Sequence, residues 1–437
     1  MALPRKNDAF SGISTPQFFP KRVVLPLALP WVGASVLVKT GDRVLAGQPV
    51  LAHPEGLFCP VYASVSGTVT DIRPWAGVEG QAVLSAVIEA DGSEEIQPLS
   101  ERYSADLGIR DLHRLTYEAG VREADPYPWP LFLRVAQPAL TPPILLPFFP
   151  DLRRPIDFLI VNGMDREPGL SLRKSVLASM HEEVLEGIGI VKKLSAARKT
   201  VLTVAKDQEF APRAETMITR SGVEIVRCPD RYPLSLEPLL VQFITGREVP
   251  QPGGSSRAVG AAVLDAVTVM RLFESLNEGI PSVHTLFQFS SNETAEDAYV
   301  RLREGTLLSE FLEHSPPRAP AAAKVILGGA LQGHAQHSMD VPLLQSLDSV
   351  LIQVETSLSH FENEPCINCG YCVRSCPMNL MPNELSKFCE YGQFRQAQQN
   401  YISHCIECGI CAYVCPVRRP MVHLLRFGKQ ELAREES

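Results

Sequence analysis

Eight of the eleven cysteines lie in two short runs near the C-terminus, and both runs have the same spacing. In order along the chain they are Cys366, Cys369, Cys372 and Cys376, then Cys405, Cys408, Cys411 and Cys415. Each run reads C-x2-C-x2-C-x3-C, followed by proline. Three thiolates in a tight loop can reach three corners of one [4Fe–4S] cubane, whereas the fourth lies beyond the loop and reaches another cubane. The two runs therefore predict two [4Fe–4S] clusters.

The spacing also assigns the ligands. We predict that each cluster takes three cysteines from one run and the fourth from the other. The first cluster then has Cys366, Cys369, Cys372 and Cys415, and the second has Cys405, Cys408, Cys411 and Cys376. Because crossed ligation forces the clusters close together, the expected chemistry is one-electron transfer between them.

Zinc and disulfides are the alternatives for these cysteines. Structural zinc sites usually combine two C-x2-C pairs, whereas each run here offers four cysteines within eleven residues. The chain opens Met-Ala-Leu-Pro-Arg-Lys without an apolar signal core, which argues against export to a compartment where disulfides form. The other three cysteines have no partners at ligand spacing and are expected to be small buried residues: Cys59, Cys228 and Cys389.

The composition indicates a multidomain protein without a nucleic-acid role. The chain has 437 residues, and its 41 basic and 49 acidic residues give a net charge of −8 without a long run of either sign. No stretch of about 20 apolar residues could span a membrane, and the most apolar early segment, 23–38, is broken by prolines and a glycine. Peripheral association with a membrane complex needs no such stretch.

Two upstream regions have to position the cysteine runs. Short apolar segments separated by turns fill residues 36–72, in a pattern that resembles the barrel-sandwich fold of biotinyl and lipoyl carriers. A carrier needs a lysine at the hairpin tip, but residues 53–56 read His-Pro-Glu-Gly. We therefore expect a docking or structural module here.

Residues 99–255 have a different pattern, that of alternating strands and helices. The segments concerned are apolar strands at 158–162, 200–204 and 222–226, and an amphipathic helix at 176–191. Their order predicts a parallel sheet covered by helices. The first strand ends in a polar turn with Asn162, Asp165 and Glu167, at the edge where open α/β sheets bind ligands. An ordinary βα loop is the alternative.

The order of these regions resembles the RnfC family, the peripheral iron–sulfur component of the Rnf ion-translocating oxidoreductase, related to the flavin-binding subunit of respiratory complex I. The segments that carry the resemblance are 41–48, 63–69, 183–188, 245–250, 328–333, 340–342 and both cysteine runs. It implies a multidomain α+β fold with four parts: a tail and barrel-sandwich hybrid at 1–98, an α/β domain like the complex I flavin-binding subunit at 99–255, a β-grasp-like region of SLBB type at 256–352, and an α-helical ferredoxin domain at 353–437.

The chain departs from the family at the flavin and NADH loop. The family pattern is G-x-G-G-A-G-F-P, whose glycines let the backbone approach phosphate and flavin. The corresponding segment, 118–130, keeps one glycine, contains three prolines and adds the carboxylates of Glu123 and Asp125. The family's Y-P-x-G-G also becomes Tyr-Pro-Leu-Ser-Leu at 232–236. We therefore predict that NADH binding is lost and FMN with it, with Asn162, Asp165 and Glu167 as a residual flavin site.

The resemblance implies an electron-transfer subunit of a membrane-associated complex, on the cytoplasmic side of the inner membrane. Its partners would be the membrane subunits and a redox protein. No acid–base or nucleophilic constellation is evident, so we assign no catalytic residue. Two alternatives stay open: an NADH-oxidising flavin-containing subunit, and a soluble ferredoxin-like adaptor of a cytoplasmic reductase.

Short helices are expected between the runs, at 383–391 and 392–401, and basic residues follow the second run: Arg418, Arg419, Arg426 and Lys429. A solvated basic face is the simpler interpretation. The alternative is a docking surface for an acidic redox partner, which charge reversal at Arg418 and Arg419 would test.

Overall fold

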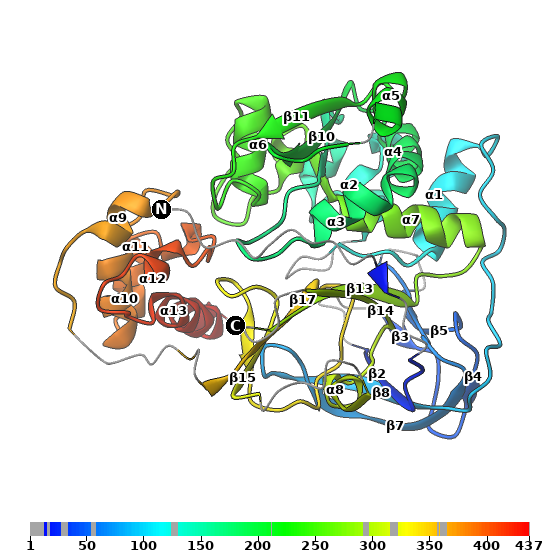
Figure 1. Ribbon diagram of the computed structural model, residues 1–437, viewed down its shortest axis with the longest axis horizontal. Helices are drawn as coiled ribbons and strands as arrows, with labels where there is room; N and C mark the ends of the chain where they lie inside the picture. Colours follow the sequence, from blue (N-terminus) through cyan, green and yellow to red (C-terminus); the bar gives the residue numbers. More distant parts are fainter. Residues whose placement is uncertain are drawn as a thin grey trace.

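The computed structural model describes residues 13–14, 18–27, 34–53, 58–123, 130–210, 212–291, 297–314, 322–355, 358 and 365–436 (Figure 1). The hairpin tip at 54–57 and residues 124–129 of the altered flavin loop, including Asp125, lie outside the described residues. Among the described helices, none is both long and apolar enough to cross a membrane.

The N-terminal domain is a barrel sandwich of two small sheets with strand orders β2-β8-β7-β4 and β3-β5-β6. Its strands are β2 (Arg22–Pro26), β3 (Ser35–Val36), β4 (Arg43–Val44), β5 (Pro49–Ala52), β6 (Val61–Tyr62), β7 (Gly67–Ala76) and β8 (Ala82–Ala90). Valine, leucine and isoleucine side chains from both sheets form one core, which includes Val23, Val50 and Ile88. A Cβ at Gly67 would lie 1.9 Å from the Glu89 carbonyl oxygen, so β7 can begin against β8 only with glycine. The predicted barrel sandwich is confirmed.

The central domain is built on a parallel sheet with strand order β11-β10-β9-β12. The strands are β9 (Phe158–Asn162), β10 (Lys199–Ala205), β11 (Glu224–Cys228) and β12 (Ala261–Asp265). The helices are α1 (Ile109–Glu118), α2 (Leu131–Val135), α3 (Leu172–Ser179), α4 (His181–Ser195), α5 (Pro212–Arg220), α6 (Glu237–Thr245) and α7 (Ala266–Glu278). Short 3-10 turns are η1 (Pro138–Leu140), η2 (Pro143–Leu145), η3 (Pro150–Arg153) and η4 (Ser256–Val259).

The predicted parallel sheet with covering helices is confirmed, and the helices lie on both of its faces. Side chains of α1, α4 and α7 pack on one face, and those of α6 pack on the other. The helix predicted at 176–191 is divided because Met180 has non-helical backbone angles, φ −127° and ψ 32°. The predicted domain boundary at residue 255 falls before β12, which pairs with β9, and before α7.

The third region is a mixed sheet with strand order β1-β14-β13-β17-β15-β16. Its elements are β1 (Ile13–Ser14), β13 (His284–Ser291), β14 (Ala298–Arg303), β15 (Lys324–Leu327), β16 (His334–Gln336), β17 (Ser349–Gln353) and the helix α8 (Leu308–His314). Phe311 of α8 packs in a core with Phe287 and Val350 of the sheet. The barrel sandwich is joined to this region, because Val24 N donates to Gly305 O at 2.8 Å and Ser64 Oγ donates to Glu304 O at 2.5 Å.

The C-terminal domain is helical and lies at one end of the molecule (Figure 1). Its helices are α9 (Tyr371–Ser375), α10 (Pro382–Glu390), α11 (Phe394–Gln399), η6 (Ile402–His404), α12 (Ile410–Tyr413) and α13 (Met421–Glu436). The helices predicted between the cysteine runs are confirmed as α10 and α11. The three cysteines outside the runs are buried, as expected: Cys59, Cys228 and Cys389.

Candidate metal centres

The two cysteine runs fold into the same backbone loop. Left-handed residues, with positive φ, occur at the same offsets in both runs: Asn368 (53°), Gly370 (73°) and Asn379 (54°) in the first, and Glu407 (54°), Gly409 (78°) and Arg418 (49°) in the second. A one-turn helix, α9 or α12, follows the left-handed glycine in each case. Glycine and asparagine adopt this conformation readily, whereas for glutamate and arginine it is uncommon. The surroundings must therefore hold Glu407 and Arg418 in place.

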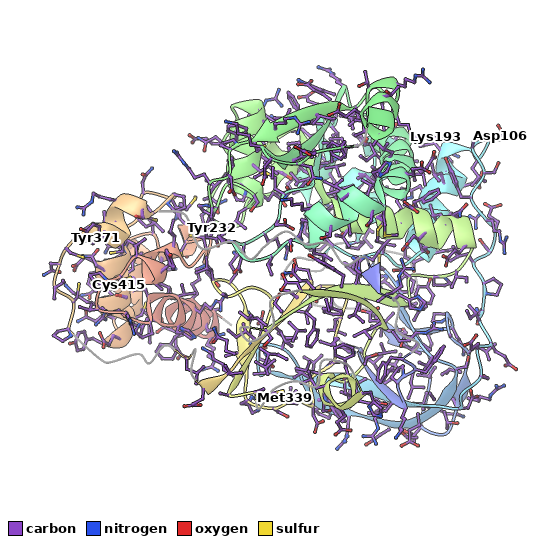
Figure 2. The ribbon with its side chains drawn as sticks, in the orientation of Figure 1. Asp106, Lys193, Tyr232, Met339, Tyr371 and Cys415 are labelled. Carbon is purple, nitrogen blue, oxygen red and sulfur yellow. The ribbon has the colours of Figure 1, made fainter. Side chains whose placement is uncertain are left out.

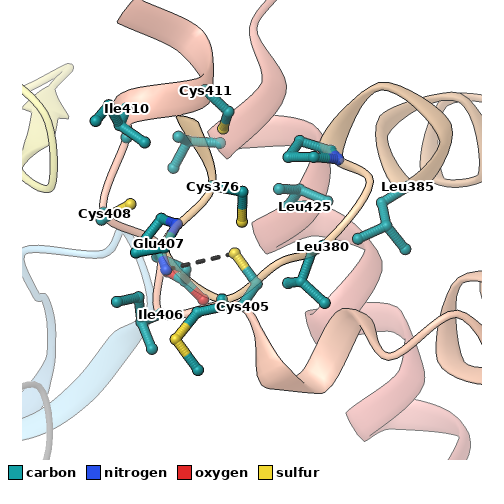
Figure 3. Close-up of a pocket in the computed structure, with 15 residues that line it drawn as sticks. Cys376, Leu380, Leu385, Cys405, Ile406, Glu407, Cys408, Ile410, Cys411 and Leu425 are labelled. Atoms are coloured by element: carbon teal, nitrogen blue, oxygen red, sulfur yellow. Dashed lines mark hydrogen bonds between the residues drawn. The ribbon is translucent and has the colours of Figure 1, made fainter. Parts of the chain in front are cut away.

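The sulfurs predicted for the second cluster border one pocket (Figure 3). Its cysteines are Cys376, Cys405, Cys408 and Cys411, so the fourth cysteine of the first run lies with three from the second. Burial and, to a smaller extent, the neighbouring sulfurs of Cys405 and Cys376 raise the pKa of the Cys408 thiol to about 11. The backbone N–H of Glu407 points at Cys405 Sγ, 3.4 Å away.

The residues predicted for the first cluster also lie close together. Burial raises the pKa of Cys372, and the sulfurs of Cys366 and Cys415 raise it as well. Cys415 packs against the apolar cluster that contains Cys372. Cys369 lies in the same loop, where its carbonyl oxygen accepts a hydrogen bond from Arg374 Nη2 at 3.3 Å. The structure thus places Cys415, the fourth cysteine of the second run, beside the cysteines of the first run.

The donor set fits an iron–sulfur cluster. Within the described residues, no three histidine, cysteine, aspartate or glutamate side chains converge closely enough to hold a single metal ion. The sulfurs of the second run instead surround a pocket whose other walls are mainly apolar, with Leu380, Leu385 and Leu425 among them. Thiolates in apolar surroundings are the usual protein ligands of [4Fe–4S] clusters.

Charged residues fix the second run to its own domain. Arg426 Nε and Lys429 Nζ donate to the Glu407 carboxylate at 2.8 and 2.7 Å. Although burial acts to raise the pKa of Glu407, these two cations hold it below its usual value. Lys429 Nζ also donates to Cys405 O at 2.6 Å. Sequence reasoning missed these roles because no spacing rule links Glu407 with α13.

The solvated basic face predicted after the second run is wrong, whereas the docking surface offered as its alternative stays a prediction. Arg419 is 6% exposed and donates to the Glu390 carboxylate of α10 at 2.6 Å. Arg426 and Lys429 are paired with Glu407. Arg418 is exposed. The four basic residues therefore do not form a solvated face, and three of them stabilise the domain.

The residues predicted as a residual flavin site are engaged within the protein. Asn162 Nδ2 donates to Ser235 O at 3.0 Å, and its Oδ1 accepts from Met164 N at 3.1 Å. Asp165 accepts a hydrogen bond from the Arg173 backbone N–H at 2.8 Å. Both Glu167 oxygens accept backbone N–H groups of residues 331 and 332 at 2.7 Å. Burial raises the pKa of Asp165 and Glu167 to about 7.

Further charged groups fill the same end of the sheet. The buried Arg173 side chain donates to Asp265 at 2.5 Å and to Asp348 at 3.0 Å. Glu123, also buried, accepts from the Asp265 backbone N–H at 3.3 Å, and burial raises its pKa to about 7. Arg173 is thus paired with two carboxylates, and Glu123 is satisfied by hydrogen bonds, which is how buried charged and polar groups are usually accommodated.

The fold and the paired cysteine runs define a multidomain iron–sulfur protein whose central domain has the fold of a flavin-binding subunit. Three known families match parts of the chain: the RnfC barrel sandwich hybrid domain over residues 11–93, the Nuo51 FMN-binding domain over 146–274, and the 4Fe-4S dicluster domain over 365–419. The N-terminal domain is thus similar to that of RnfC proteins.

Curated relatives match most of the chain. The C component of the proton-translocating ferredoxin:NAD(+) oxidoreductase complex of Clostridium ljungdahlii is 28% identical, over 87% of this chain and 81% of the relative. The C component of the Na(+)-translocating ferredoxin:NAD(+) oxidoreductase complex of Acetobacterium woodii is 29% identical, over 94% and 91%. The C component of the ion-translocating oxidoreductase complex of Klebsiella pneumoniae is 29% identical over 95% of this chain, which spans about half (54%) of that relative.

The fold also matches a solved structure. The NAD+-reducing [NiFe]-hydrogenase in its H2-reduced state has a chain that aligns with a TM-score of 0.50 at 14% identity. The alignment covers 76% of this chain and 62% of the hydrogenase chain. At this identity the likeness concerns the fold alone.

Proposed function

We propose that the chain is the electron-transfer subunit of an RnfC-type oxidoreductase complex, through which single electrons pass by way of two [4Fe–4S] clusters. The observation that carries the proposal is the pocket in which Cys376 of the first run lies with Cys405, Cys408 and Cys411 of the second. Curated relatives named as components of ion-translocating complexes support the assignment to such a complex. The partners would be its membrane subunits and a redox protein, with this chain peripheral on the cytoplasmic side.

Bound [4Fe–4S] clusters would supply one-electron chemistry at potentials that the protein sets. The chain's own residues would hold the thiolates and exclude water. The apolar walls of the pocket keep the sulfurs dry, and the Glu407 N–H stabilises negative charge on Cys405. Hydrogen bonds to sulfur and burial are the protein's usual means of setting such potentials.

We infer further that NADH oxidation is lost, together with flavin. A flavin phosphate needs free N–H groups and room for close backbone approach. The described residues do not fit it, because their polar groups bind one another. A Cβ at Gly329 would already lie 2.1 Å from the Glu167 carboxylate. Glu123 brings a further carboxylate to the N-terminus of α7, where an anion would otherwise bind.

A second candidate is an NADH-oxidising, flavin-containing subunit, which the match to the Nuo51 FMN-binding domain favours. A soluble ferredoxin-like adaptor is the third. Genes for membrane subunits beside this one would support the complex over the adaptor.

Anaerobic purification with iron, sulfide and flavin analysis tests these proposals together. We expect about eight irons per chain, from two four-iron clusters, and no flavin. About four irons would contradict the crossed-ligand assignment. A bound yellow cofactor, with NADH-driven bleaching of the cluster absorbance, would show that the flavin site works.

A further inference from the structure

The 328–333 loop connects β15 and β16 and lies between the central domain and the second cysteine run. We propose that Glu167 is a positioning residue that fixes this loop as the support for the second run, so that the end of β9 controls the environment of the second cluster. This inference rests on the proposed two-cluster function. It gives a buried carboxyl group of the central domain a role in electron transfer.

On one side the loop is bound by the Glu167 carboxylate. Oε2 accepts the Leu331 N–H and Oε1 accepts the Gln332 N–H, both at 2.7 Å, and Glu167 is 4% exposed. Consecutive backbone N–H groups form a natural anion site, and these two hydrogen bonds act against the burial that raises the pKa of Glu167. Gly329 leaves space for the carboxylate, because any Cβ there would collide with it.

On its other side the loop contacts the cysteine run. The Leu331 carbonyl oxygen would lie 2.7 Å from a Cβ at Gly409, so the two backbones touch. Arg426 donates to Gln332 O at 2.6 Å through Nη2 and to Gly333 O at 3.4 Å through Nη1. The loop therefore presents its N–H groups to the central domain and its carbonyl groups to the C-terminal domain.

Arg426 then continues the connection to a predicted cluster ligand. Its Nε donates to Glu407, whose own N–H points at Cys405 Sγ. The hydroxyl of Tyr232 donates to the Cys408 carbonyl oxygen and adds a second contact between the domains. Figure 2 shows Tyr232 where the central domain meets the C-terminal helices. A displacement of the 328–333 loop would thus change the hydrogen bonding around Cys405 and Cys408.

The first run has different neighbours. Among the described atoms, a Cβ at Gly370 would meet only the Arg374 guanidinium, at 3.3 Å, where the matched Gly409 meets Leu331. A change at Glu167 should therefore affect one cluster and leave the other as it was. A purely structural role for Glu167 would not make this distinction.

The experiment compares Glu167→Gln with Glu123→Gln in the full-length, cluster-loaded protein. Both residues are buried carboxyl groups whose pKa is raised to about 7, but Glu123 bonds Asp265 N and Thr268 within the central domain. The readouts are the midpoint potential of each cluster, by titration followed with electron paramagnetic resonance, and amide hydrogen exchange at Leu331 and Gln332. A Cys369→Ser variant identifies the signal of the first cluster.

We expect Glu167→Gln to shift the potential of the second cluster alone and to speed exchange at both amides at least tenfold, while Glu123→Gln changes neither. Gly329→Ala, which displaces the carboxylate, should act in the same way and serves if Glu167→Gln does not fold. The proposal would be overturned if Glu167→Gln and Gly329→Ala both kept wild-type midpoint potentials and wild-type amide exchange. It would also be overturned if either variant shifted the potentials of the two clusters equally. Failure of the two-cluster function is seen separately, as fewer than about eight irons in the unaltered protein.

Discussion

The two cysteine runs share spacing and backbone conformation but differ in their surroundings. Ile367 of the first run is 61% exposed, whereas the matching Ile406 of the second run is half-buried. Likewise, Tyr371 of the first run is 52% exposed, whereas the matching Ile410 of the second run borders the pocket. The first run lies toward the outer end of the molecule, where Figure 2 shows Tyr371. The second run faces the 328–333 loop and the central domain.

The difference separates two tasks that one motif performs. The spacing of the cysteines determines which thiolates can reach one cluster, and this is the same in both runs. The residues around each run determine how far solvent can reach the cluster site and whether a redox partner can approach it. In the proposed relay, the first run is the end that an outside redox protein can reach, and the second run is the end whose environment the rest of the chain controls.

Replacing the fourth cysteine of each run should have the largest effect. With crossed ligation, Cys415→Ser removes a ligand from the first cluster and Cys376→Ser removes one from the second. We expect each variant to lose or convert the cluster of the opposite run, measured by iron content and electron paramagnetic resonance. Cys369→Ser and Cys408→Ser serve as references for the two signals. Should Cys415→Ser reproduce the spectrum of Cys408→Ser, each run would ligate its own cluster.

Charge reversal next to the second run should separate a buried cation from an exposed one. Arg419→Glu breaks the ion pair with Glu390 and places two carboxylates together, at a cost of about 3 kcal/mol in the stability of the domain. Arg418→Glu, at an exposed position, should change stability by no more than about 0.5 kcal/mol. The measurement is the urea concentration at which iron is released. Equal midpoints for the two variants would show that the buried pair contributes nothing.

The two left-handed glycines allow a matched test of the surroundings. Gly370→Ala and Gly409→Ala each force alanine into the left-handed region, which costs about 1–2 kcal/mol. Gly409→Ala also places a methyl group against the Leu331 backbone, and such overpacking costs about 1–3 kcal/mol more. We expect faster iron loss on warming from Gly409→Ala than from Gly370→Ala. Identical rates of iron loss would mean that the 328–333 loop moves aside for the methyl group without a measurable loss of stability.

Truncating the side chain after each glycine should have the smallest effect. Ile410 borders the pocket, so Ile410→Ala should destabilise the domain by about 1–2 kcal/mol. Tyr371 is mostly exposed and contacts Arg374 through its ring, so Tyr371→Ala should cost only about 0.5 kcal/mol. Thermal unfolding of the two variants, with the wild type as reference, measures the difference. The asymmetry between the runs would be disproved if Tyr371→Ala were the more damaging change.

The sequence predicts local features of this protein well. The strands at 158–162 and 200–204 and the two helices between the cysteine runs follow from short-range patterns, and the structure has them. The division at Met180 has no proline or glycine to mark it. The strand expected at 222–226 lies two residues later, as β11.

Contacts between distant segments could not be predicted in the same way. Glu167 binds the N–H groups of residues 331 and 332, and Arg419 binds Glu390, because the fold brings those elements together. From sequence alone, Glu167 is assigned to a flavin site and Arg419 to a solvated basic face. Only the tertiary arrangement shows that Glu167 is hydrogen-bonded to backbone N–H groups and that Arg419 is buried beside Glu390.

The pairing of β1 with β14 has a consequence for how the protein is made. Ile13 lies opposite Tyr299 in this parallel pair, so the pairing cannot form until that tyrosine leaves the ribosome. At translation rates of about 5–20 residues per second, the wait is roughly 15–60 s. The sheet of the third region, which includes both strands, can therefore be completed only late in synthesis.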